Sequence, residues 1–120
     1  MKLPRIGISA MLLTALAVPG AVWAHATLQT ARPAKDAVVA APAEITLQFN
    51  EKLEGAFSSA RVVDSAGMEI RTDKAVLDPG NPAVLKLALL ALPAGKCTVE
   101  YVVVGHDGHR RKGDYAFTVK

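Results

Sequence analysis

Four residues of this sequence stand out as candidate metal ligands: the histidines at positions 25, 106 and 109, and Asp107. Asp107 and His109 are two positions apart, so both side chains project to the same side of an extended segment, and Gly108 between them leaves the backbone free to bend. They offer one carboxylate oxygen and one imidazole nitrogen. His106 is either an alternative ligand or, as we expect because its side chain should point away from that of Asp107, an exposed bystander.

The N-terminal segment has the organisation of a secretory signal peptide. Lys2 and Arg5 precede an apolar run from Ile6 to Val18, Pro19-Gly20 breaks any helix, and Val22-Trp23-Ala24 offers a small residue before a cleavage site. The run is too short to span a bilayer, which takes about 20 residues. We therefore expect residues 1–24 to be removed and the protein to be exported to the periplasm.

Cleavage after Ala24 gives His25 a property that no internal residue has, a free α-amine. The amine and the imidazole Nδ1 of one terminal histidine can bind a metal together and close a six-membered chelate ring. Cleavage after Ala26, the alternative small-residue site, would discard this histidine. With the first cut, the donors become three nitrogens and one carboxylate oxygen, which suit one tetragonal Cu(II) ion. Zn(II) would accept the same donors tetrahedrally, with weaker binding.

The remaining chain, residues 25–120, is long enough for one small domain and no more. The formal charge of +3 loses Lys2 and Arg5 with the signal peptide and falls to +1, so no strong basic field suggests a nucleic-acid partner. Cys97 is the only cysteine, so no internal disulfide can form. In a strand, Cys97 would lie on the same face as Val99, Tyr101 and Val103, because every second side chain points the same way. This face predicts a buried thiol rather than a metal ligand, and it places Tyr101 in the core.

Alternating or β-branched apolar patterns predict about seven short strands, separated by turn-forming residues. The expected strands are Thr27–Thr30, Glu44–Asn50, Phe57–Asp64, Met68–Arg71, Ala83–Leu90, Lys96–Val104 and Gly113–Val119. No convincing amphipathic helix is present. This pattern predicts an all-β fold, a small Greek-key β-sandwich or barrel of the cupredoxin-like or immunoglobulin-like kind. We expect Arg110-Arg111-Lys112 to lie in a solvated turn before the last strand.

Sequence segments along the whole of residues 25–120 resemble the CopC/PcoC family of periplasmic copper-resistance proteins. The matching segments are His25-Ala26-Thr27-Leu28, Arg32-Pro33-Ala34-Lys35-Asp36-Ala37, Ile45 to Leu53, Leu92 to Tyr101, Asp107-Gly108-His109, Gly113 and Phe117-Thr118-Val119. The resemblance implies a cupredoxin-like β-sandwich that binds Cu(II) through His25, Asp107 and His109. It also implies that Glu51 lies near the copper and bonds the amine or ring of His25, although a surface carboxylate beside Lys52 is an equal interpretation.

The resemblance also indicates which copper ion is bound. Some members of the family have a second, Cu(I) site in a methionine-rich loop, because soft thioethers suit the reduced ion. After removal of the signal peptide, this chain retains only Met68. We therefore expect a Cu(II)-only member.

The leading functional hypothesis is a copper carrier or buffer, not an enzyme, that delivers Cu(II) to a CopD-type inner-membrane transport protein. The main alternative is a copper-dependent oxidative enzyme, because lytic polysaccharide monooxygenases also bind copper through a terminal histidine. The absence of tryptophan from residues 25–120 argues against a broad polysaccharide-binding face. An iron oxygenase with two histidines and a carboxylate, and a sandwich that binds no metal, are the remaining alternatives.

Overall fold

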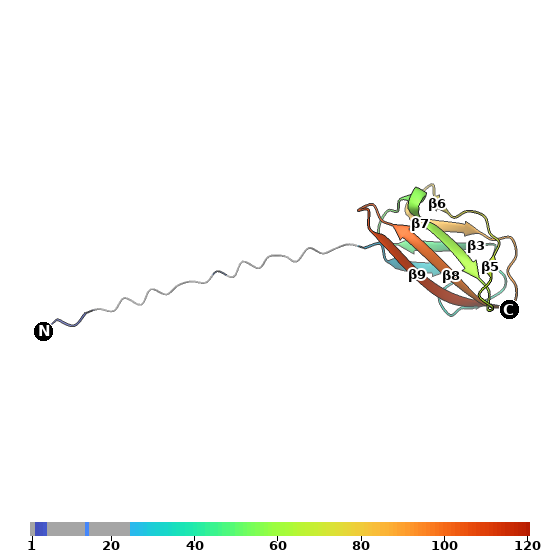
Figure 1. Cartoon of the computed structure of the whole chain (residues 1–120), viewed down its shortest axis with the longest axis horizontal. Helices are drawn as coiled ribbons and strands as arrows, with labels where there is room; N and C mark the ends of the chain where they lie inside the picture. The colour runs from blue at the N-terminus through green and yellow to red at the C-terminus, as the bar shows by residue number, and fades with distance from the viewer. Residues whose placement is uncertain (1, 5–13, 15–24) are drawn as a thin grey trace.

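The structure is a computed structural model that describes residues 2–4, 14 and 25–120. The prediction of a signal peptide with a cleavage site after Ala24 falls almost entirely on residues outside this described part. The remainder of the chain forms the folded unit in Figure 1.

Nine strands and one 3-10 turn make up this unit. In chain order they are β1 (Leu28–Arg32), β2 (Val38–Val39), β3 (Glu44–Phe49), η1 (Gly55–Phe57), β4 (Ser59–Val63), β5 (Glu69–Ile70), β6 (Val76–Asp78), β7 (Asn81–Ala88), β8 (Gly95–Val104) and β9 (Arg110–Val119). One sheet has the strand order β1-β3-β7-β6 and the other the order β2-β9-β8-β4-β5. The chain passes back and forth between the two sheets, which confirms the predicted β-sandwich (Figure 1).

The core lies between the sheets and follows from the alternation of side chains along the strands. In β3, Ile45, Leu47 and Phe49 are buried, whereas Glu44 and Gln48 between and before them are exposed. Because successive side chains of a strand point to opposite faces, this pattern places one face of β3 against the other sheet. Each fully buried aliphatic or aromatic side chain of this kind contributes about 1.5–3 kcal/mol.

The seven expected strands are present with shifted ends, and the sequence patterns missed β2 and β6. These two strands have only two and three residues, too few to show a period, and β2 is recognisable only because it pairs in parallel with the end of β9. The strand expected from Ala83 begins at Asn81. Pro82 is tolerated there because the pairing of β7 with β3 does not begin until Val84.

The expectation of a solvated turn at Arg110-Arg111-Lys112 is wrong, because these residues form the start of β9. They pair with Val104, Val103 and Val102 of β8. This part of the strand was not predicted because a half-buried strand is expected to alternate apolar and polar residues, and three consecutive charged residues do not. The β8–β9 hairpin is therefore regular up to the loop that carries Asp107 and His109.

Candidate metal centre

Asp107 and His109 lie in the loop that joins β8 to β9, and a turn rather than an extended segment brings them together. Gly108 has a φ of 83°, a conformation that favours glycine, and its N–H donates to the carbonyl of Gly105 at 2.9 Å. The N–H of Gly105 donates to the carbonyl of His109 at 3.0 Å. The predicted proximity of the two side chains is thus found, but through the tight loop and not through strand alternation.

The carboxylate of Asp107 is bound to His109 through both oxygens. Its Oδ1 accepts the backbone N–H of His109 at 3.0 Å, and its Oδ2 lies 3.0 Å from Nδ1 of the same residue. The hydrogen bond from the His109 N–H is the main reason that the pKa of Asp107 lies below its usual value, and the His109 and His25 rings lower it further. The carboxylate is therefore ionised at neutral pH and suited to a cation.

Asn50 fixes the backbone that carries His25. Its Oδ1 accepts the N–H of Thr27 at 2.7 Å, and its Nδ2 donates to the carbonyl of His25 at 3.2 Å. The N–H of Asn50 also donates to the carbonyl of Thr27 at 3.0 Å, just beyond the pairing of Leu28 with Phe49. Sequence reasoning missed Asn50. The one available sign of its role was its position, directly after β3 and directly before Glu51.

The histidines that are 84 positions apart in the sequence meet at this end of the sandwich. The rings of His25 and His109 pack edge to face, with centroids 5.3 Å apart and an interplanar angle of 86°. Within residues 25–120, however, no three His, Cys, Asp or Glu side chains converge closely enough to enclose a metal ion as they stand. The structure places the three predicted ligands side by side, and side-chain rotation must complete any coordination.

Glu51 borders the same cluster. A Cβ atom added to Gly105 would collide with Oε1 of Glu51 and lie 3.1 Å from Oδ1 of Asp107, so both carboxylates flank the space above Gly105. Oε1 of Glu51 is buried and has no hydrogen-bond partner among the described residues. A buried carboxylate oxygen without a donor is unfavourable, and a nearby cation would compensate for it. The position of Glu51 thus fits a metal centre better than an ordinary surface carboxylate.

His106 is exposed, as expected, with 79% of its side chain accessible to solvent. It is not isolated, because its Nδ1 lies 3.4 Å from Oε1 of Glu54. The segment before η1 is attached to the hairpin here: the N–H of His106 donates to the carbonyl of Lys52, and the N–H of Glu54 donates to that of Val104. These backbone bonds also hold Glu51 beside the loop.

Cys97 and Tyr101 of β8 lie outside the cluster. The Cys97 thiol is fully buried, and burial raises its pKa, so the prediction of a core thiol is confirmed. Tyr101 was expected in the core but is only half-buried. Its ring packs edge to face on Phe49 at 5.4 Å, and its hydroxyl end extends across Gly113 of β9, where a Cβ atom would collide with it.

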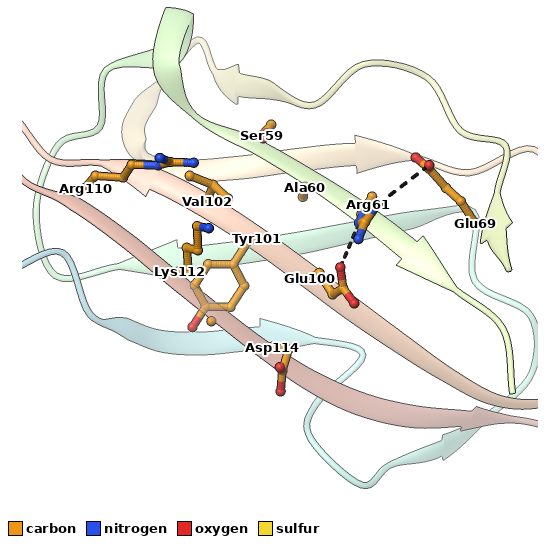
Figure 2. Close-up of a pocket in the computed structure, with 11 residues that line it drawn as sticks. Ser59, Ala60, Arg61, Glu69, Glu100, Tyr101, Val102, Arg110, Lys112 and Asp114 are labelled. Carbon is orange, nitrogen blue, oxygen red and sulfur yellow. Dashed lines mark hydrogen bonds and ion pairs between the residues drawn. The ribbon is translucent and has the colours of Figure 1, made fainter. Parts of the chain in front are cut away.

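A shallow hollow on the outer face of the five-stranded sheet belongs to a different part of the molecule. Figure 2 shows Arg61 of β4 between Glu100 and Glu69, with Arg110 and Lys112 of β9 farther along the face. The Nε of Arg61 donates to Glu100 at 2.7 Å, and an ion pair of 3.9 Å joins it to Glu69. None of the predicted metal ligands lines this hollow.

The fold and the cluster define a small β-sandwich with histidine and carboxylate side chains gathered at the end of one hairpin. The CopC domain model matches residues 28–120, and the chain belongs to this family. The protein YobA of Escherichia coli K12 is 42% identical over 113 residues, which cover 92% of this chain and 90% of YobA. The predicted resemblance is thereby confirmed.

Two solved structures show the same fold. CopC from Methylosinus trichosporium OB3b has a TM-score of 0.75 and 34% identity, and the match covers 80% of this chain and 94% of that one. PcoC, described as a methionine-rich copper resistance protein from Escherichia coli, has a TM-score of 0.74 and 32% identity, with coverage of 81% and 100%. At these identities, the likeness extends beyond the fold to the family.

Proposed function

We propose that this protein binds one Cu(II) ion through His25, Asp107 and His109 and carries or sequesters copper in the periplasm. The observation that carries the proposal is the contact between the His25 and His109 rings, with Asp107 bonded to His109. Three donor-bearing residues, one before β1 and two in the β8–β9 loop, thus lie close together. The copper resistance named for the relative PcoC supports copper as the cargo. The proposed function involves binding and release, with no chemical step.

The donor set depends on processing of the chain. In the full sequence the nitrogen of His25 belongs to a peptide bond, and cleavage after Ala24 would convert it into an amine. Such an amine and the His25 ring would supply two nitrogens, His109 a third, and Asp107 an oxygen, which together favour Cu(II) over Zn(II). The Asn50 clamp on His25 and Thr27 supports this arrangement, because it holds the start of the domain beside the hairpin loop.

Glu51 acts in this proposal as a supporting carboxylate rather than as a ligand. Its buried Oε1 has no hydrogen-bond donor among the described residues. It would accept a hydrogen bond from an N–H of the terminal amine or of the His25 ring and so orient that residue toward the copper. Residues that orient ligands in this way contribute about 10–100-fold to metal affinity.

The surroundings of Met68 support a Cu(II)-only protein. Met68 follows β4, and β4 runs away from the metal loop: Ser59 pairs with Val102, and Val63 at the other end pairs with Thr98. The only methionine of residues 25–120 therefore lies at the opposite end of the sandwich from His109. One remote thioether provides no Cu(I) site.

A periplasmic location and a CopD-type inner-membrane partner complete the proposal, and both rest on the resemblance to the CopC/PcoC family. Among the described residues, no helix has the length and hydropathy needed to cross a bilayer. A membrane transport partner would then receive copper at the hairpin end of the sandwich. Asp107 and His109 are partly exposed there, so an incoming ligand can reach them.

Titration of the mature protein with Cu(II), followed by electron paramagnetic resonance, tests the site. Protein that begins at His25 is expected to bind one tight equivalent with a tetragonal spectrum of nitrogen and oxygen ligands. One extra N-terminal residue, or the substitutions His25→Ala and His109→Ala, should each weaken that equivalent by 100-fold or more. His106→Ala is the matched control and should retain it. Tight binding by His25→Ala equal to that of the unmodified protein would refute the proposed ligand set.

A further inference from the structure

We propose that His106 and Glu54 form a second, weaker Cu(II) site on the outer side of the hairpin loop. Neither residue belongs to the ligand set of the first site. His106 directly precedes Asp107, and its side chain contacts Glu54 in the segment that leads into η1. The second site would let one domain bind two equivalents of Cu(II) when copper is abundant.

The two donor atoms form an ion pair whose spacing is also compatible with two ligands on one ion. Nδ1 of His106 and Oε1 of Glu54 are 3.4 Å apart. Metal bonds to imidazole nitrogen and carboxylate oxygen are about 2.0–2.2 Å long, so two such donors at right or tetrahedral angles lie about 2.8–3.5 Å apart. The pair Asp107 Oδ2 and His109 Nδ1, at 3.0 Å, falls in the same range. An ion could therefore bridge His106 and Glu54 once the two side chains, which now face each other, rotate toward it, as at the first site.

Backbone hydrogen bonds hold both residues in place. The N–H of His106 donates to the carbonyl of Lys52 at 2.9 Å, and the N–H of Glu54 donates to the carbonyl of Val104 at 2.8 Å. The carbonyl of Glu54 in turn accepts the hydroxyl of Ser58 at 2.8 Å. With both backbones fixed, metal binding restricts only the side-chain torsions, which reduces its entropic cost.

The exposure of the pair indicates a weak and rapidly exchanging site. The side chains of His106 and Glu54 are 79% and 47% exposed, so water must supply the remaining ligands. Beside them lies an open hollow lined in part by Glu54, Gly108 and Arg110, which gives access from solvent. The positive charge of Arg110 in this hollow lowers the affinity further. As an ion pair alone, such an exposed contact contributes only about 0–1 kcal/mol to stability, so the fold does not require it.

The test uses the mature protein and two sets of variants. Unmodified protein should bind a second equivalent of Cu(II) more weakly than the first, and His106→Ala and Glu54→Gln should each weaken only that second equivalent, by about tenfold. Glu44→Gln, which removes an exposed carboxylate at the start of β3, is the matched control and should bind as the unmodified protein does. A second equivalent that is unchanged in both His106→Ala and Glu54→Gln would overturn the inference.

A His25→Ala background separates this inference from the proposed function. In that background the tight equivalent should be lost, and Cu(II) added below stoichiometry should broaden the nuclear magnetic resonance signals of the His106 ring. Restoring His25 should move the first broadening to the His109 ring. If the His106 signals stay sharp in the His25→Ala protein while the His109 signals broaden, the second site is refuted, whatever the state of the first.

Discussion

The carboxylate of Glu51 occupies the space in which a side chain at position 105 would have to lie. A methyl group on Gly105 would displace Oε1 of Glu51, which is the mobile end of a flexible side chain, so the fold should tolerate Gly105→Ala. Both Gly105→Ala and Glu51→Gln should weaken Cu(II) binding by about tenfold, the lower end of the range for residues that orient metal ligands. Isothermal titration of each variant measures the effect.

Gly80→Ala provides the matched control for this prediction, because a Cβ atom there would make only an ordinary contact of 3.5 Å with Asp78 and would not meet Glu51. It should bind Cu(II) as the unmodified protein does. Full affinity in Gly105→Ala and Glu51→Gln together would show that Glu51 is only a surface carboxylate.

The Asn50 clamp predicts a loss of affinity without a change of ligands. Asn50→Ala removes the acceptor for the Thr27 N–H and the donor to the His25 carbonyl, so the start of the domain should become more mobile. Losing hydrogen bonds of this kind costs about 1–3 kcal/mol in stability. We expect weaker Cu(II) binding with an unchanged electron paramagnetic resonance spectrum, because all donors remain.

Asn81→Ala separates the clamp from a general loss of stability. Asn81 also accepts a backbone N–H through its side chain, that of Ala83 at 3.0 Å, but in the β6–β7 hairpin. This variant should be destabilised and yet bind Cu(II) normally. Equal affinities in Asn50→Ala and the unmodified protein would contradict a positioning role for Asn50.

Cys97 is predicted to be inert toward copper and toward thiol reagents while the protein is folded. Its thiol is fully buried, and its nearest polar contact, the carbonyl of Gly95, is 3.9 Å away. Cys97→Ser places a hydroxyl in this apolar site and should cost about 1–3 kcal/mol of stability, whereas Cys97→Ala should cost less. Urea unfolding measures the difference. Rapid reaction of the native thiol with a disulfide reagent would disprove the burial.

Tyr115 predicts a loss of stability at alkaline pH. Burial raises the pKa of its hydroxyl to about 12, whereas tyrosine in the unfolded chain ionises near pH 10. Between these values the unfolded chain releases the proton first, so the free energy of unfolding falls as pH rises from about 10 to 12, by about 2–3 kcal/mol in total. Below pH 10 this group contributes no pH dependence.

Tyr115→Phe should remove this alkaline loss, since no ionisable hydroxyl remains. The hydroxyl has no hydrogen-bond partner among the described residues, so the variant should be at least as stable as the unmodified protein at neutral pH. Chemical unfolding at several pH values gives the comparison. A steep loss of stability above pH 10 that persists in Tyr115→Phe would assign the effect to another group.

The amino-acid sequence by itself determined the long strands, their inward faces and the chemical identity of the donor residues. Alternation along β3 and β8 marks Leu47, Phe49, Cys97 and Val99 as core because a strand turns every second side chain to the same face. The Asp107-Gly108-His109 triplet was visible for a similar reason, since residues so close in sequence must be near in space.

Only the tertiary structure decided which distant residues meet. The contact of His25 with His109, the place of Glu51 above Gly105 and the Asn50 clamp depend on the pairing of β1 with β3 and on the backbone bonds between the Glu51–Glu54 segment and the hairpin loop. Such contacts join residues from different strands, and a local pattern carries no information about register or loop geometry. The His106–Glu54 pair, which has the same origin, was therefore apparent only in the folded chain.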